Sequence, residues 1–313
     1  MTEDQNILSN GLAIVRRNKR YVVWFYLLNL ALAWMGAGAF RQQARAVLDH
    51  SLYSNGLVQG FDLGVFGEML ARPEFGPSRA STVPAMGLAA IFLLLTIVLL
   101  PGVFLGYASD HRISRDEFFR ACGRNLWRFV RLTILFAIIG GMVAGVLFSI
   151  QHAIIEAASA TSHETLPFYM QLACLAVIFL LMTAIRIWFD LAEADVVLAD
   201  KGAVCKALGK AFRQTRQNLV SLVGTYVLVS IVGAVILGGG IWLWHTIVPP
   251  ASVFGAFLIS QATLCLLLAT RFWQRATVVA FYTGNMLEQT VTVQLATSVE
   301  ALPAPIAPQT AVM

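Results

Sequence analysis

Long apolar runs, almost free of charged residues, recur six times along the chain. They cover residues 21–40, 84–107, 132–150, 168–190, 219–244 and 253–270. About 20 apolar residues in an α-helix cross a hydrocarbon core of about 30 Å, where the backbone has to satisfy its own hydrogen bonds. Strands of a membrane barrel would instead alternate over about ten residues. We therefore predict an all-α fold, a polytopic membrane bundle of six transmembrane helices within residues 1–285.

The composition supports a membrane protein, because 58% of the 313 residues are hydrophobic and only 12% are charged. A soluble chain carries about 25% charged residues. The net charge of +5 and the pI near 9.2 would suggest nucleic-acid binding in a soluble protein. Here the placement of the charges gives a different explanation.

The basic residues are distributed unequally between the connecting segments. Of the 22 Lys and Arg residues, 18 lie in the N-terminal segment, in the second and fourth connections and around the end of span six. The other four are Arg41, Arg45, Arg72 and Arg79. Basic residues near span ends stay on the cytoplasmic side. We predict a bacterial inner (cytoplasmic) membrane protein with both termini in the cytoplasm, and no nucleic-acid partner.

Two basic connections have the pattern of amphipathic helices that lie in the membrane interface. The predicted apolar faces consist of Phe119, Cys122 and Leu126 in one helix and of Val204, Leu208, Phe212 and Leu219 in the other. The predicted basic faces include Arg120, Arg124, Arg128, Lys206, Lys210 and Arg213. Near an anionic leaflet each such residue contributes about 1 kcal/mol to binding. We expect these six side chains to bind lipid headgroups.

The two connections also match each other in sequence. At an offset of 93 residues, eight identities align, among them Asn125 with Asn218 and Phe119 with Phe212. The N-terminal segment, with Leu8, Leu12 and Val15, is a looser third copy. This pattern favours three units, each made of an amphipathic elbow, an outgoing helix and a returning helix.

Residues 190–235 carry a family resemblance. Asp195-Val196-Val197-Leu198-Ala199-Asp200-Lys201-Gly202-Ala203, Ala207-Leu208-Gly209-Lys210-Ala211-Phe212-Arg213 and Asn218-Leu219 resemble the basic elbow of six-span bacterial proteins similar to the membrane domain of some glycerophosphodiester phosphodiesterases. In that family a separate soluble domain carries the catalysis. Because we find no such domain in this sequence, the resemblance implies a membrane module without hydrolase activity.

The densest polar cluster near the lipid lies at the end of span four, where Arg186, Asp190 and Glu193 share one helical face. Span six ends with Arg271 and Arg275, one turn apart. A charge in the core costs at least about 2.5 kcal/mol, so these groups should face protein or water and pair. We favour a structural clasp between Arg271 or Arg275 and Asp190 or Glu193. The alternative is a proton or substrate path that uses the carboxylates.

Metal and catalytic signatures are weak or missing. His152 and Glu156 lie one turn apart on the exported side, where His163 also falls, but no third ligand follows at a fixed spacing. The four cysteines form no Cys-x-x-Cys pair. The sequence contains no nucleophile elbow, nucleotide-binding loop or metalloprotease helix. We predict no metal site, no cofactor and no enzymatic activity.

Small residues and helix breakers form a further pattern. The stripes Gly102-x-x-x-Gly106 and Gly141-x-x-x-Gly145 favour close helix packing. Pro101 and Gly102 predict a kink in span two, and Gly238, Gly239 and Gly240 mark a second candidate helix break. Transporters use broken helices as substrate sites, which is the alternative interpretation of these positions.

Two segments lie outside the spans. The exported loop 41–83 is long, with a helical extension of span one over residues 41–52 and an amphipathic stretch over residues 61–72. It caps the bundle, rests on the headgroups or binds a membrane or extracytoplasmic protein partner. Residues 286–313 contain little charge and end in a Pro-rich stretch. We predict a disordered cytoplasmic tail there.

These patterns leave three hypotheses for the function. The leading one is a non-enzymatic membrane subunit or scaffold that its basic elbows anchor to anionic lipids. The alternative is a transporter or export permease for an apolar or amphipathic substrate. A lipid-modifying enzyme would need a polar catalytic group within a span, and only Asp190 and Glu193 come close.

Overall fold

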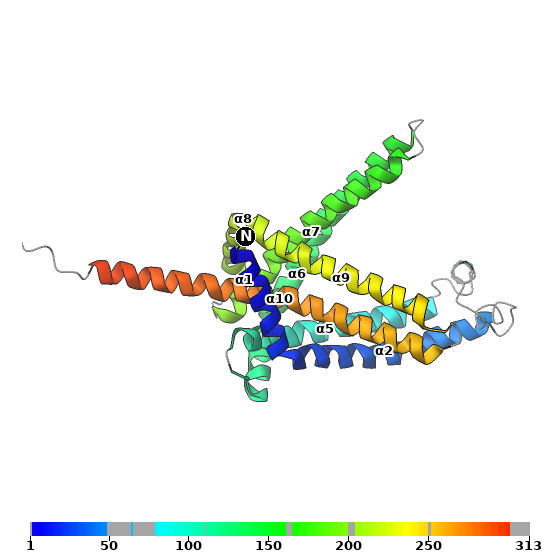
Figure 1. Ribbon diagram of the computed structural model, residues 1–313, viewed down its shortest axis with the longest axis horizontal. Coiled ribbons are helices and arrows are strands. Elements are labelled where there is room, and N and C mark those ends of the chain that lie inside the picture. The colour runs from blue at the N-terminus through cyan, green and yellow to red at the C-terminus, as the bar shows by residue number, and fades with distance from the viewer. Residues whose placement is uncertain are drawn as a thin grey trace, which may run out of the picture.

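The computed structural model describes residues 2–48, 64, 79–109, 111–160, 165–199, 204–249 and 252–300. These residues form eight helices and no strands (Figure 1). The helices are α1 (Thr2–Arg17), α2 (Lys19–Leu48), α5 (Arg79–Ala108), α6 (Arg115–Ser159), α7 (Leu166–Leu198), α8 (Val204–Gln217), α9 (Leu219–Ile247) and α10 (Val253–Glu300). Within the described residues, six helices are long and apolar enough to cross a membrane, namely α2, α5, α6, α7, α9 and α10.

Each predicted span lies within one of these six helices, but α6 begins well before the predicted span. A capping box fixes its start, because the Glu117 backbone N–H donates to Ser114 Oγ (3.2 Å) and the Ser114 backbone N–H donates to Glu117 Oε2 (2.9 Å). The second basic segment and span three therefore form one continuous helix of 45 residues, about 68 Å long.

We use the name elbows for α1, residues 115–131 of α6, and α8. An asparagine within an elbow, or at the residue directly after it, donates its side-chain amide to the carbonyl four residues earlier in all three cases. The three hydrogen bonds are Asn18 to Ile14 (3.2 Å), Asn125 to Ala121 (3.1 Å) and Asn218 to Gln214 (3.3 Å). At Asn18 and Asn218 the chain turns into the next helix, whereas it stays helical through Asn125. The shared position of this bond supports the repeat of three units.

Each elbow packs against the returning helix of another unit, so that α6 lies on α5, α8 on α7, and α1 on α10. Trp188 on α7 donates its indole N–H to the Leu208 carbonyl (2.9 Å), and Trp273 on α10 donates to the Leu8 carbonyl (3.1 Å). The two leucines each lie ten residues before the asparagine of their elbow. The three units therefore form a closed ring.

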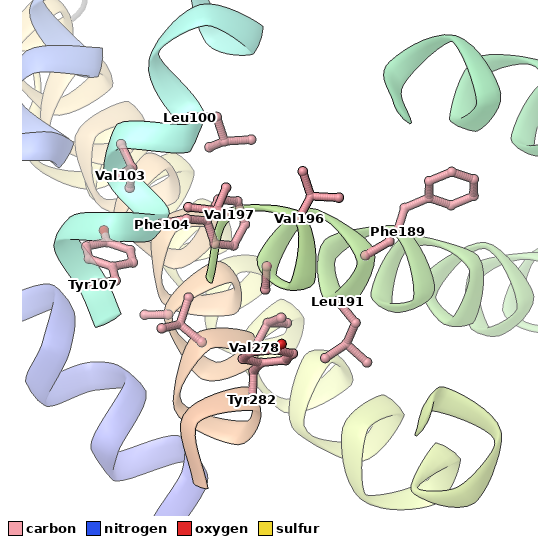
Figure 2. Packing of buried hydrophobic residues seen from close by; sticks show 14 of the residues in the cluster. Leu100, Val103, Phe104, Tyr107, Phe189, Leu191, Val196, Val197, Val278 and Tyr282 are labelled. Atoms are coloured by element: carbon pink, nitrogen blue, oxygen red, sulfur yellow. The ribbon is translucent and has the colours of Figure 1, made fainter. Parts of the chain in front are cut away.

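The returning helices α5, α7 and α10 contact one another at the centre of this ring, and Figure 2 shows the core that they share. Buried side chains from the three helices meet there, among them Val103, Leu191 and Val278. Away from the core, α6 and α7 run side by side and diverge from α9 and α10 (Figure 1). The three returning helices thus pack together at the elbow end, whereas α7 and α9 diverge farther along their length.

Helix α5 continues through Pro101 and Gly102, and α9 continues through Gly238, Gly239 and Gly240, so neither helix is interrupted there. The kink at Pro101 and Gly102 stays a prediction. A Cβ on Gly102 would collide with the Phe118 ring, and one on Gly106 would collide with Tyr21. This stripe therefore lets elbow and span aromatics approach the α5 backbone. Gly141 and Gly145 on α6 have no such neighbour within 4 Å, so the packing predicted there is not observed.

The segments outside the spans are described only in part. Helix α2 extends to Leu48 and α5 begins at Arg79, so the amphipathic stretch of the loop 41–83 lies outside the described residues, apart from Gly64. Helix α10 continues to Glu300, past residue 286 where we predicted disorder, and residues 301–313 lie outside the described residues. No proline interrupts 286–302, and a helix that is already formed extends at little cost.

Candidate functional site

The polar cluster at the end of span four lies at the same level as the arginines of span six. Arg186 follows the start of α7 by 20 residues, which is about 30 Å along the helix, and Arg271 follows the start of α10 by 18 residues, about 27 Å. Both positions are near the elbow end of helices whose preceding residues carry no charge. The two arginines therefore mark one boundary of the apolar zone.

Asp190 is buried, with 4% of its surface exposed, and its partners come from α7 and α9. The Tyr226 hydroxyl donates to Asp190 Oδ2 (2.7 Å), and Arg186 Nε lies 3.6 Å from the same oxygen. Among the described residues, no ion pair within 4 Å joins Asp190 or Glu193 to Arg271 or Arg275. The link between helices therefore differs from the predicted clasp, because a tyrosine of span five occupies the place expected for an arginine of span six.

A cavity of about 460 Å³ lies between α7, α9 and α10. Its polar lining consists of Thr183, Arg186, Tyr226, Ser230, Thr270, Arg271 and Gln274. Its remaining lining consists of Phe179, Gly233, Ala234, Leu237 and Leu267. We call it the large cavity. Its volume falls in the range of about 300–1,000 Å³ that is typical of small-molecule sites.

The large cavity is polar at one end and apolar at the other. Along α9 the lining changes from Tyr226 and Ser230 to Leu237, and the other two helices change in the same direction. On α7 it runs from Arg186 to Phe179, and on α10 from Arg271 to Leu267. All three polar ends lie toward the elbows, so the cavity has the polarity of an amphipathic molecule.

A second cavity of about 130 Å³, the small cavity, lies on the other side of α7, between α5, α6, α7 and α10. Arg186 lines both cavities, while Asp190, Glu193 and Arg275 line only the small one. Glu193 Oε2 and Arg275 Nε are buried there without a hydrogen-bond partner. The cavity has room for water, which would supply the missing partners.

A second buried aspartate lies five residues farther along α7. Asp195 Oδ1 accepts hydrogen bonds from Lys210 Nζ (2.7 Å) and from the Tyr282 hydroxyl (2.7 Å). This group ties α8 to α7 and α10. Lys210, which we predicted to bind a lipid headgroup, is therefore engaged within the protein, because the buried face of α8 consists of Val204, Ala207, Ala211 and Thr215 rather than of the larger apolar residues.

The other basic side chains predicted to bind headgroups remain on the surface of the elbows. Arg120, Arg124, Lys206 and Arg213 are exposed, whereas Arg128 donates to Asn125 Oδ1 (3.1 Å). Phe119, Trp127 and Phe212 are also more than half exposed on the same elbows. Basic and aromatic side chains therefore share the elbow surface, as is typical of membrane interfaces.

The predicted weak metal candidates remain apart from other ligands. His152 Nδ1 lies 3.8 Å from Glu156 Oε2, and both side chains are more than three-quarters exposed. His163 lies outside the described residues. Within the part of the chain that the structure describes, no group of three His, Cys, Asp or Glu side chains is arranged to hold a metal ion.

Sequence reasoning missed the lining of α9 and Gln274 on α10. Gln274 Nε2 donates to Ser230 Oγ (3.1 Å), which joins the two helices beside Arg271. A signal was present, since Tyr226, Ser230, Gly233, Ala234 and Leu237 follow helical spacing along one face of span five. Polar and small residues on one face of an otherwise apolar span indicate a face turned away from lipid.

No curated protein and no solved structure matches this chain. One family model does, over residues 6–302, and its description is Domain of unknown function (DUF7847). This match does not test the resemblance of residues 190–235 to the membrane domain of glycerophosphodiester phosphodiesterases, which stays a prediction. Because the matched region covers the six apolar helices and the elbows, the chain belongs to the DUF7847 family.

Proposed function

We propose that the protein is a transporter or export permease for an amphipathic substrate, and that the large cavity is its substrate site. The observation that carries this proposal is the graded lining, in which α7, α9 and α10 all change from polar to apolar in one direction. Ionisable residues within membrane helices generally mark substrate or ion paths. Helix α7 diverges from α9 (Figure 1), and we place the entry of such a molecule from the lipid between these two helices.

The proposal includes an orientation in a bacterial inner membrane. Since 18 of the 22 basic residues belong to the elbow end, we infer that the elbows and both termini are cytoplasmic. The polar end of the large cavity then lies at the headgroup level of the inner leaflet. A lipid-like molecule would enter with its headgroup among the arginines and its tail toward the bilayer centre.

Reconstitution tests this function directly. Vesicles of phosphatidylcholine and phosphatidylglycerol would contain the purified protein and a trace of acyl-labelled fluorescent phospholipid, and movement between leaflets would be followed by back-extraction with albumin. We expect protein-dependent movement, and an Ala234→Phe variant should lose most of it because the new ring fills the large cavity.

The matched control is Val235→Phe, which adds the same ring at the next residue of α9. Val235 is 68% exposed and lines neither the large nor the small cavity, so this variant should move lipid at the wild-type rate. Equal rates for Ala234→Phe and the wild type, or no protein-dependent movement of any labelled lipid, would contradict the proposal.

A membrane subunit or scaffold is the second candidate, and the elbow surface favours it. Exposed Arg120, Lys206 and Arg213, together with exposed Phe119 and Phe212, suit binding to an anionic headgroup layer. Stable co-purification of one partner protein, without any lipid movement in vesicles, would support the scaffold. The loop 41–83 is where we expect an extracytoplasmic partner to bind.

A further inference from the structure

The charges around the large cavity do not balance. Arg186 is paired with Asp190, and Asp190 also accepts a hydrogen bond from the Tyr226 hydroxyl. Glu193, the next acidic residue of α7, lines the small cavity and not the large one. Arg271 therefore has no acidic partner within 4 Å among the described residues.

An unpaired arginine at the boundary of the apolar zone is a binding group for a counter-charge. Arg271 lies about 27 Å along α10 from Val253, beside Leu267 and the apolar half of the cavity. A charge in such surroundings is retained when it pairs with another group, faces water or binds a ligand. Because Asp190 already has Tyr226 and Arg186 as partners, the described residues supply no free carboxylate on this side of α7.

Hydrogen-bond donors converge on the same end of the cavity. Arg271 is an exposed residue that lines the cavity, and Arg186 lines the cavity with it. The Gln274 side chain is fixed by the hydrogen bond that its Nε2 donates to Ser230 Oγ (3.1 Å). Arginine side chains bind phosphate and carboxylate groups by paired N–H donors. The opposite end, with Phe179, Leu237 and Leu267, offers only apolar surface.

We propose that the large cavity binds an amphiphile with an anionic headgroup, whose phosphate or carboxylate pairs with Arg271 while its hydrocarbon tail lies against Phe179, Leu237 and Leu267. This inference rests on the proposed function and names the substrate class of the same site. An inorganic anion alone would leave the apolar half of the cavity unfilled, and an uncharged lipid would leave Arg271 without its counter-charge.

The test measures lipid binding to the intact protein in detergent, by native mass spectrometry and by the shift in thermal unfolding. The probes are phosphatidylglycerol, oleate, phosphatidylcholine and inorganic phosphate. We expect phosphatidylglycerol or oleate to bind at least about tenfold more tightly than phosphatidylcholine, because a charge-assisted pair is lost with the neutral headgroup. Inorganic phosphate should not compete. Tighter binding of phosphatidylglycerol than of oleate would identify the ligand as a phospholipid, and the reverse would identify it as a fatty acid.

Arg271→Gln should weaken binding of the acidic amphiphile by about tenfold, and Arg271→Lys should retain most of it. Arg213→Gln is the control, since this exposed arginine lies on α8 and does not line either cavity. If Arg271→Gln did not fold, Arg271→Lys would still test the site. This variant should keep the preference for acidic over zwitterionic lipid. Equal binding of acidic and zwitterionic lipid by the wild type would overturn the inference.

The outcomes separate this inference from the transport function on which it rests. If vesicles move phosphatidylglycerol and phosphatidylcholine equally, and Ala234→Phe blocks both, the function stands and the anionic preference is wrong. If acidic lipid binds in an Arg271-dependent way but no lipid moves, the site stands and the transport function is wrong. Absence of both binding and movement would contradict both.

Discussion

Two aspartates on α7, five residues apart and equally buried, have opposite surroundings. Asp195 has short hydrogen bonds to Lys210 and Tyr282, both 2.7 Å, and lines neither of the two cavities. Asp190 has one short bond, to Tyr226, and an arginine at 3.6 Å, and it lines the small cavity. A buried carboxylate with close partners and no adjacent space holds helices together. One with looser partners beside a cavity contributes less to holding the helices together.

The largest effect that we expect comes from removing the well-packed aspartate. Asp195→Ala should lower the free energy of unfolding by about 3 kcal/mol, because Lys210 and Tyr282 lose their common acceptor. The Lys210 side chain is 36% exposed, which keeps the cost at the lower end of the range for a buried pair. Unfolding in detergent with increasing dodecyl sulfate measures this change. A loss below about 1 kcal/mol would mean that the Asp195 cluster is not a structural tie.

An intermediate effect should come from the tyrosines, and here the two clusters can be compared by the same substitution. Tyr226→Phe should destabilise the protein by about 2 kcal/mol, since Asp190 would keep only Arg186 at 3.6 Å. Tyr282→Phe should cost about 1 kcal/mol, because Asp195 would keep Lys210 at 2.7 Å. The midpoints of thermal unfolding of the two variants, measured side by side, give the order. The reverse order would remove the distinction between the clusters.

The smallest effect on stability should come from Glu193→Gln. Glu193 Oε2 is buried without a hydrogen-bond partner, so loss of its charge should change the free energy of unfolding by less than about 1 kcal/mol, in either direction. The same thermal measurement, with Asp195→Asn as the reference, checks it. A loss as large as that of Asp195→Asn would show that Glu193 has a structural partner that the pattern of contacts does not reveal.

The apolar pattern alone predicted the helical class and the position of each span, because the bilayer requires long uncharged helices. It also predicted the elbow repeat, which the equivalent amide bonds of Asn18, Asn125 and Asn218 now support. These features depend on residues close together in sequence. The extent of α10 beyond residue 286 was missed, since composition does not reveal that a formed helix will extend.

The partners within the candidate site could not be predicted from the sequence. Whether Asp190 meets Arg271 or Tyr226 depends on the rotation of α7 and α9 about their axes, which two continuously apolar patterns leave open. The rotation of α8 also could not be predicted, and it decides that Lys210 pairs with Asp195 instead of facing the lipid headgroups. Helix α8 turns small residues rather than Phe212 toward the core. Periodicity identifies an element, but packing decides which face of it is buried.

The bond between Trp273 and the Leu8 carbonyl joins residues 265 positions apart. Among the described helices α1 is the first to be synthesised, yet the helix against which it packs, α10, is the last. Docking of α1 therefore has to follow the synthesis of α10. A chain that stops before α10 lacks the packing partner of α1, so the ring of three units cannot close.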